Sequence, residues 1–167
     1  MEFKNEIGQI QRRMAASIAG TSRRLEILNA LDIESGHHVI DIGCGGGHLL
    51  EEIAKAVGPE GKAYGLDTSE DQLKQARKRC SLYKNVFTIK GYANQISLEN
   101  NSCDSICSVQ TFEYIDNVDE SIKELTRILK PSSIFVNISI LWEYYKFFGA
   151  DEELNKTIHD TFKAHCF

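Results

Sequence analysis

The feature that most constrains the fold is a run of glycines that follows a short apolar segment. Residues 39–42, Val-Ile-Asp-Ile, have the β-branched, apolar character of a buried strand, and glycines occupy positions 43, 45, 46 and 47. The apolar residues between 49 and 57 then recur at helical spacing. Glycine admits positive φ and close approach of a ligand, and the first turn of a helix offers unpaired N–H groups to an anionic group. The run therefore predicts a ligand-binding turn between a strand and a helix.

Strand and helix patterns alternate through residues 38–140. Further strands are expected at 62–66, 86–89, 105–109 and 134–140, with helices at 69–80 and 117–130. The strands are short and apolar throughout, which is typical of a parallel sheet covered on both faces by helices that right-handed crossovers connect. The predicted fold class is α/β, a doubly wound, mostly parallel sheet of about five strands. Ligands bind such sheets at the carboxyl ends of the strands.

The flanks of this core are predicted to be helical. Ile7, Ile10, Met14 and Ile18 lie three or four residues apart and predict an amphipathic helix over 5–19. Thr21 or Ser22 can cap a second short helix with Leu25, Leu28 and Leu31 on one face. The inner face of the 117–130 helix is expected to carry Val118, Ile122, Leu125 and Ile128. The chain of 167 residues is interpreted as one domain, 1–167, made of N-terminal helices (1–35), a ligand-binding core (36–140) and a helical tail (141–167).

The composition and charge of the chain limit the classes of partner that it can bind. The net charge of −5 argues against a nucleic-acid binder that neutralises phosphates and against an anionic-membrane binder. No apolar run reaches the length of a membrane span, and residues 1–6 lack the apolar core of a secretory signal, so a cytoplasmic location is expected. The five cysteines are scattered without ligand spacing, so no metal site is expected.

Asp67, at the end of the second predicted strand and 24 residues after Gly43, can accept hydrogen bonds from both hydroxyls of a ribose. Two nucleoside-binding patterns are compatible with this arrangement. The dinucleotide pattern Gly-x-Gly-x-x-Gly fits poorly, because His48 occupies its third glycine position. The pattern Asp-x-Gly-x-Gly-x-Gly fits Asp41, Gly43, Gly45 and Gly47 without a mismatch.

On these residues the chain resembles the class I S-adenosylmethionine-dependent methyltransferases, in the methyltransferase type 11 or ubiquinone-biosynthesis-like group that acts on small molecules. The similarity covers about residues 24–140. The matching segments are Val39 to Gly47, Gly65 to Ser69, Gly91 to Ala93, Cys103-Asp104, Gln110 to Ile115 and Glu124 to Pro131.

The resemblance implies an S-adenosylmethionine site and a role for each matching residue. Asp41 would orient the glycine turn and approach the amino group of the cofactor, and Asp67 would hold the ribose hydroxyls. The methionine portion would lie along Gly43, Cys44 and Gly45 and touch the backbone of Gln110, and the adenine would lie against Thr68, Tyr92 and Ala93. The alternatives are a turn-stabilising carboxylate for Asp41, a helix-cap residue for Asp67 and simple packing for Thr68 and Ala93.

Methyl transfer from a sulfonium needs mostly alignment, and a base only if the acceptor must lose a proton. The candidate catalytic side chains are Glu113, Tyr114 and His48, the last with the alternative of a polar helix-start residue. The chain departs from the family at Tyr92, where an aspartate is usual, and at residues 131–133, where Pro-Ser-Ser replaces Pro-Gly-Gly.

The usual final antiparallel strand pair of the family is expected to be absent. The fifth strand would then be an exposed apolar edge, which a second copy in a homodimer or another partner chain could cover. Two further functions remain open: a non-catalytic cofactor-binding or partner module with this fold, and an NAD-dependent oxidoreductase.

Overall fold

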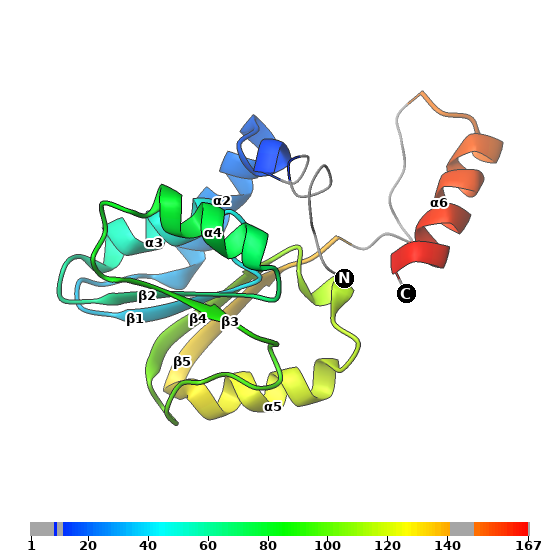
Figure 1. The fold of residues 1–167 in the computed structure, drawn as a ribbon. Helices are drawn as coiled ribbons and strands as arrows, with labels where there is room; N and C mark the ends of the chain where they lie inside the picture. Colours follow the sequence, from blue (N-terminus) through cyan, green and yellow to red (C-terminus); the bar gives the residue numbers. More distant parts are fainter. Residues whose placement is uncertain (1–8, 10–11, 141–148, 167) are drawn as a thin grey trace.

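The sheet has the strand order β3-β2-β1-β4-β5, and every pairing between these strands is parallel (Figure 1). The computed structural model describes residue 9 and residues 12–140 and 149–166. The strands are β1 His38–Ile42, β2 Lys62–Asp67, β3 Val86–Lys90, β4 Cys103–Val109 and β5 Leu129–Ile138. The helices are α2 Ile18–Leu31, α3 His48–Val57, α4 Glu70–Arg79, α5 Val118–Ile128 and α6 Glu152–Cys166, with a short 3-10 helix, η1, at Phe112–Tyr114.

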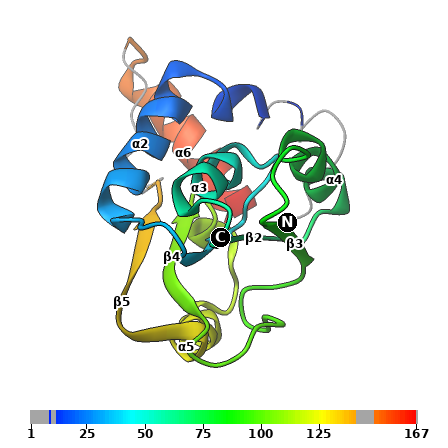
Figure 2. The ribbon, with the colours of Figure 1, turned by 90° about the vertical axis from the view of Figure 1, so that its left-hand side faces the viewer.

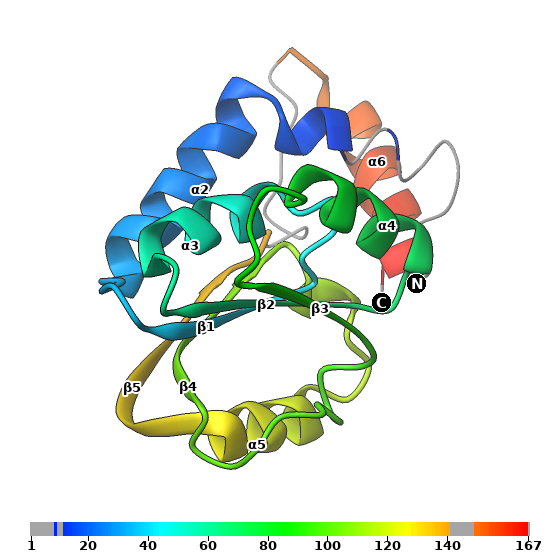
Figure 3. The same ribbon diagram turned by 60° about the vertical axis from the view of Figure 1, so that its left-hand side comes forward.

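Helices cover both faces of the sheet, as the sequence predicts. In Figure 3, α2, α3 and α4 lie on one face and α5 lies on the other. Each face has its own apolar core, because the short strands alternate buried side chains toward the two helical layers. The core under α2–α4 contains Ile27, Val39, Leu50, Ile53 and Cys107 among others, and the core under α5 contains Ile40, Leu66, Ile106, Leu125 and Ile128. The predicted doubly wound fold is confirmed.

The order of the strands reverses at β1. From β1 the chain moves outward to β2 and β3, then returns to place β4 on the other side of β1 and β5 beyond it. Ile42, the last residue of β1, pairs with Leu66 of β2 and with Ser108 of β4. The loops that leave these three strands therefore separate in opposite directions and leave a crevice at their carboxyl ends.

The N-terminal helices differ from the prediction. The second helix begins at Ile18, and its cap is Ser17, whose hydroxyl accepts a hydrogen bond from the Gly20 N–H; the cap is not Thr21 or Ser22. Ile18 consequently lies on the outer side, 91% exposed, because the chain turns between residues 15 and 18. Leu25 is also exposed, and the buried residues of α2 are Gly20, Arg24, Ile27 and Leu31. Ile7 and Ile10 lie outside the described residues.

Two expectations for the second half of the sheet also need correction. Leu125 and Ile128 of α5 are buried, but Val118 and Ile122 are exposed, and Ser121 takes the inner position near the start of the helix. The fifth strand begins at Leu129 and ends at Ile138, so the Pro-Ser-Ser segment lies inside it rather than before it.

A shift in register explains how β5 accommodates residues 130–133. Cys103 pairs with Leu129, but Ser105 pairs with Ile134, so the four residues 130–133 stand opposite Asp104 alone and form a bulge within the strand, where Ser132 has a φ of 64°. Pro131, which lacks an N–H, is tolerated because β5 is an edge strand (Figure 2).

The predicted tail helix is present as α6, which stands apart from the α/β layers in Figure 1. None of the helices in the described part of the chain has the length and the apolar character that crossing a membrane requires.

The packing of α4 on the glycine turn can be tested with two glycines. Gly47 has a φ of 79°, and a Cβ there would lie 2.8 Å from Ala76 Cα on α4; Gly36 has a φ of 91°, and a Cβ there would meet nothing within 4 Å. We predict that Gly36→Ala lowers the free energy of unfolding by about 1–2 kcal/mol, the cost of left-handed backbone for an L residue. Gly47→Ala should lose about 1–3 kcal/mol more through overpacking. Urea denaturation measures both, and equal losses would contradict close packing at Gly47.

Candidate functional site

A cavity of about 700 Å³ lies at the carboxyl ends of β1, β2 and β4. Pockets of about 300–1,000 Å³ hold ligands of cofactor size. All nine residues that the sequence singles out for cofactor binding line this cavity: Asp41, Gly43, Cys44, Gly45, Asp67, Thr68, Tyr92, Ala93 and Gln110. The topology therefore brings four separate segments of the chain to one place.

The glycine turn is fixed to the end of the neighbouring strand. The N–H groups of Gly43 and Cys44 both donate to the carbonyl oxygen of Leu66, at 2.8 and 2.9 Å. Gly43, Gly45 and Gly47 have φ values of 74°, 50° and 79°, which residues with a Cβ rarely adopt. Within this turn, the three glycines of the predicted pattern are the residues with positive φ, and Gly46 is not among them.

Close approach is a second requirement at Gly43. A Cβ at this position would lie 2.1 Å from Oγ1 of Thr111, which follows β4. The turn after β1 and the turn after β4 are therefore in contact at the floor of the cavity.

Asp67 joins the second strand to the turn. Its Oδ2 accepts a hydrogen bond from the Gly45 N–H at 2.9 Å, and its Oδ1 accepts one from the Ser69 N–H at 2.8 Å. Burial raises the pKa of Asp67, and hydrogen bonds from the backbone N–H groups of Ser69, Gly45 and Thr68 lower it in part. The carboxylate thus supports the start of α4 while it lines the cavity, and as an acceptor-only group it retains capacity for a further donor.

Asp41 is the most buried carboxylate of the site, with 2% of its surface exposed. Burial, reinforced by the charge of Asp67, raises its pKa to about 7. Its side-chain partner among the described residues is the Cys107 thiol, whose Sγ lies 3.9 Å from Oδ1, and a thiol is a weak donor. A buried carboxylate that lines a cavity without a cationic partner is suited to a cationic group of a ligand.

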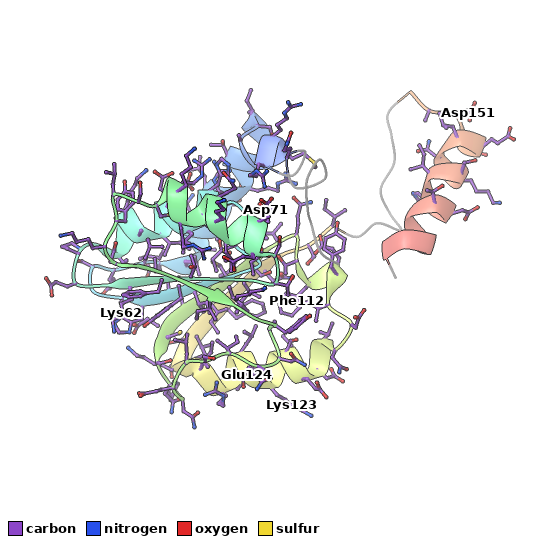
Figure 4. The ribbon with its side chains drawn as sticks, viewed as in Figure 1. Lys62, Asp71, Phe112, Lys123, Glu124 and Asp151 are labelled. Atoms are coloured by element: carbon purple, nitrogen blue, oxygen red, sulfur yellow. The ribbon has the colours of Figure 1, made fainter. Side chains whose placement is uncertain are left out.

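The rim opposite the glycine turn comes from the connection between β3 and β4. Glu124 of α5, labelled in Figure 4, accepts a hydrogen bond from the Ile96 N–H at 2.6 Å, and Arg127 donates to the Ile96 carbonyl at 2.9 Å. These bonds hold the connection in which Ala93 is buried, whereas Tyr92 is 71% exposed.

Gln110 follows β4 with a φ of 51°, a conformation that costs a non-glycine residue about 1–3 kcal/mol. Its N–H donates to the Ile138 carbonyl at 2.7 Å, which fixes this backbone at the cavity wall.

The three candidate catalytic side chains have different surroundings. His48 and Tyr114 line the cavity. Glu113 is not among the lining residues; its Oε1 accepts a long hydrogen bond of 3.4 Å from the Ile140 N–H, and its Oε2 is buried without a partner in the described part of the chain. Glu113 therefore faces the end of β5.

His48 is held in its neutral form. Burial and the charge of Arg79 lower its pKa to about 4, and Nη2 of Arg79 lies 3.1 Å from its Nε2. At neutral pH the ring therefore accepts a hydrogen bond from Arg79 at Nε2. Nε of Arg79 also donates to the Gly46 carbonyl at 3.1 Å, so this arginine secures the outer side of the glycine turn.

Sequence reasoning missed the arginines of the site. Arg12, Arg23 and Arg24, all from the N-terminal helices, line the cavity, and Arg79 supports it from α4. The available signal was the density of arginines at positions 12, 13, 23 and 24, but nothing local connects that segment to a turn that begins at residue 43.

No metal centre is found among the residues that the structure describes: no three His, Cys, Asp or Glu side chains there converge in a way that could hold an ion.

Comparison with known proteins identifies the family to which the chain is related. A family model described as a methyltransferase domain matches residues 33–167. The chain is 32% identical over 115 residues to a demethylmenaquinone methyltransferase of Geobacillus stearothermophilus, covering 68% of this chain and 49% of that protein. It is 31% identical over 124 residues to an uncharacterized 37.1 kDa protein in transposon TN4556 of Streptomyces fradiae, covering 74% and 36%. The chain thus spans about half or less of the length of these curated relatives.

Solved structures share the fold. A SAM-dependent methyltransferase from Aquifex aeolicus superposes with a TM-score of 0.68 at 24% identity, covering 84% of this chain and 77% of that one. A geranyl diphosphate C-methyltransferase from Streptomyces coelicolor, solved with Mg²⁺, geranyl diphosphate and S-adenosyl-L-homocysteine, gives a TM-score of 0.70 at 17% identity, covering 86% and 54%.

The burial of Asp41 predicts a pH dependence of stability. Its pKa is raised from 3.8 to about 7, so between these values the folded state keeps a proton that the unfolded chain releases. The free energy of unfolding should therefore fall as the pH rises from about 4 to about 7, by an amount on the order of 4 kcal/mol. Asp41→Asn does not titrate and should lack this fall. Urea denaturation between about pH 4 and pH 8 should show the variant gaining on the wild type, and parallel profiles would count against a titrating Asp41.

Proposed function

Because the chain belongs to the methyltransferase domain family, we propose that its cavity binds S-adenosylmethionine and that the protein transfers the methyl group of this donor to a small-molecule acceptor. The family match over residues 33–167 confirms the resemblance predicted from the sequence. The fold of the described residues agrees with it.

The observation that carries the proposal is the convergence of the three-glycine turn with two buried carboxylates at one cavity. The residues fit the donor at three points. Asp67 offers an acceptor carboxylate to the ribose hydroxyls, and Asp41 offers a buried carboxylate to the ammonium group. The turn at Gly43 and Gly45 lacks side chains, so the methionine portion can approach the backbone.

The remaining assignments follow from position along the cavity wall. Thr68 and Ala93 border the adenine, and Tyr92, exposed at the rim, packs over it in place of the aspartate that the family usually has there. Cys44 and the backbone of Gln110 line the methionine portion.

The reaction places few demands on side chains. When bound, the donor supplies an electrophilic methyl carbon, so the protein must chiefly align the acceptor at roughly 3 Å and exclude water. The N-terminal helices close the cavity through Arg12, Met14 and Ala15. His48 is neutral and Tyr114 stands at the wall, so both can orient an acceptor through hydrogen bonds. Glu113 faces β5 and takes no part in this scheme.

Two considerations favour a small-molecule acceptor. Two of the proteins named above are a demethylmenaquinone methyltransferase and, at the level of the fold alone, a geranyl diphosphate C-methyltransferase. The net charge of −5 does not suit a nucleic-acid acceptor.

Buried free thiols at Cys44, Cys80, Cys103 and Cys107 suit the reducing cytoplasm, where we place the protein. A second copy or another chain on the edge strand β5, where Ile134 is 39% exposed, remains a prediction.

Calorimetric titration tests cofactor binding. We predict that the protein binds S-adenosylhomocysteine and not NAD, and that Asp67→Asn weakens this binding about ten- to a hundredfold, the value of one or two hydrogen bonds to a charged group. Asp119→Asn is the matched control, because Asp119 is an exposed carboxylate on α5 outside the cavity. Binding of NAD in preference to the sulfur nucleoside would contradict the proposal.

Transfer is tested separately with labelled S-adenosylmethionine and demethylmenaquinone, geranyl diphosphate and a small-molecule extract as acceptors. Label transfer that depends on Asp67 is expected. Intact cofactor binding with no transfer to any of them would favour the alternative, a cofactor-binding module without chemistry.

A further inference from the structure

The cavity wall formed by the N-terminal helices carries three arginines, and they differ in how their charge is compensated. Nη1 of Arg12 lies 3.4 Å from Asp71 Oδ2, labelled in Figure 4, and donates to Gln72 Oε1 at 3.0 Å. Both partners belong to α4. The aliphatic part of Arg12 lies against Gly46, so this side chain ties the segment before α2 to the glycine turn.

Arg24 is compensated as well. It is buried, its Nε donates to Glu52 Oε1 on α3 at 3.1 Å, and its other nitrogens donate to the Ala15 carbonyl and the Thr21 hydroxyl. Its charge and its N–H groups are used to hold α2 against α3.

Arg23 has neither kind of partner. It is half-buried and lines the cavity, yet within residues 12–140 and 149–166 no carboxylate, carbonyl or hydroxyl pairs with its guanidinium. Among the described lining residues, Arg23 is the one arginine whose guanidinium is free to pair with a group of a ligand.

The course of α2 fixes where this charge lies. The helix ends at Leu31, and the chain enters β1 at His38, at the amino end of the sheet. The first turns of α2 therefore lie toward the carboxyl ends of the strands, and the helix packs on β4 and β5. The start of α2, which carries Arg23, thus lies over the β4 side of the sheet, where Val109 and Gln110 line the same cavity.

We propose that Arg23 binds a carboxylate-type anionic group inside the cavity. The planar guanidinium matches a carboxylate with two parallel hydrogen bonds, and a half-buried position strengthens them relative to water. This inference rests on the proposed function, which places the methionine portion of the donor and the acceptor on this side. The anionic group can come from the carboxylate of the donor or from an acidic acceptor, and the experiment separates the two.

The test compares Arg23→Met with the wild type. Arg23→Lys keeps the charge without the fork, and Arg13→Met removes an exposed arginine that does not line the cavity. The titrants are S-adenosylhomocysteine, 5′-methylthioadenosine, which is the same nucleoside thioether without the amino-acid portion, and benzoate added to protein saturated with S-adenosylhomocysteine. Circular dichroism checks the fold of each variant.

If the donor carboxylate is the ligand, Arg23→Met should bind S-adenosylhomocysteine about ten- to a hundredfold more weakly, with 5′-methylthioadenosine unchanged and Arg23→Lys intermediate. If an acidic acceptor is the ligand, both nucleosides should bind as before, and benzoate should bind the wild type but not Arg23→Met. Arg13→Met should match the wild type in every titration.

If Arg23→Met weakens the binding of both nucleosides equally, Arg23 has a packing role and the inference is overturned. The inference is also overturned if Arg23→Met binds all three titrants as the wild type does. A wild-type protein that binds neither nucleoside would instead overturn the proposed function on which the inference rests.

Discussion

The site depends on one attachment, that of the glycine turn after β1 to the end of β2. The Leu66 carbonyl accepts hydrogen bonds from two N–H groups of the turn, and the Asp67 carboxylate accepts a hydrogen bond from a third, that of Gly45. Parallel pairing of Ile42 with Leu66 sets the two strand ends level, so that these bonds can form. The positive φ values of Gly43, Gly45 and Gly47 let the turn follow this path, and α4 and Arg79 hold it from outside. The cavity exists because the turn is held open there.

This arrangement opposes stability in part. Asp41 and Asp67 are buried near each other, and burial raises the pKa of both carboxyl groups. Gln110 holds a left-handed conformation at the same edge, and Gly43 leaves no room for a side chain beside Thr111. Uncompensated charge and strained backbone are expected where a ligand supplies the missing partner. The apolar cores on both faces of the sheet supply the stability that tolerates these costs.

Local patterns were enough to predict the strand–turn–helix unit and the position of Asp67 at the end of β2, because glycine conformation and strand ends are encoded within a few residues. Helix caps and helix faces depend on tertiary packing as well: Ser17 rather than Thr21 caps α2, and Ser121, not Val118 or Ile122, lies on the inner face of α5. Tertiary partners were beyond sequence reasoning. Arg23 reaches the cavity only because α2 runs back along the sheet, and Glu113 leaves it because η1 directs that side chain toward Ile140.

The glycine turn and Asp67 together are proposed to bind the nucleoside of the donor. A crystal structure of the protein soaked with S-adenosylhomocysteine tests it most directly. We expect both ribose hydroxyls to lie within hydrogen-bond distance of the Asp67 carboxylate and the homocysteine chain to run along Gly43 to Gly45. Density for the ligand elsewhere, or an empty cavity with Asp67 bonded only to Gly45 and Ser69, would contradict it.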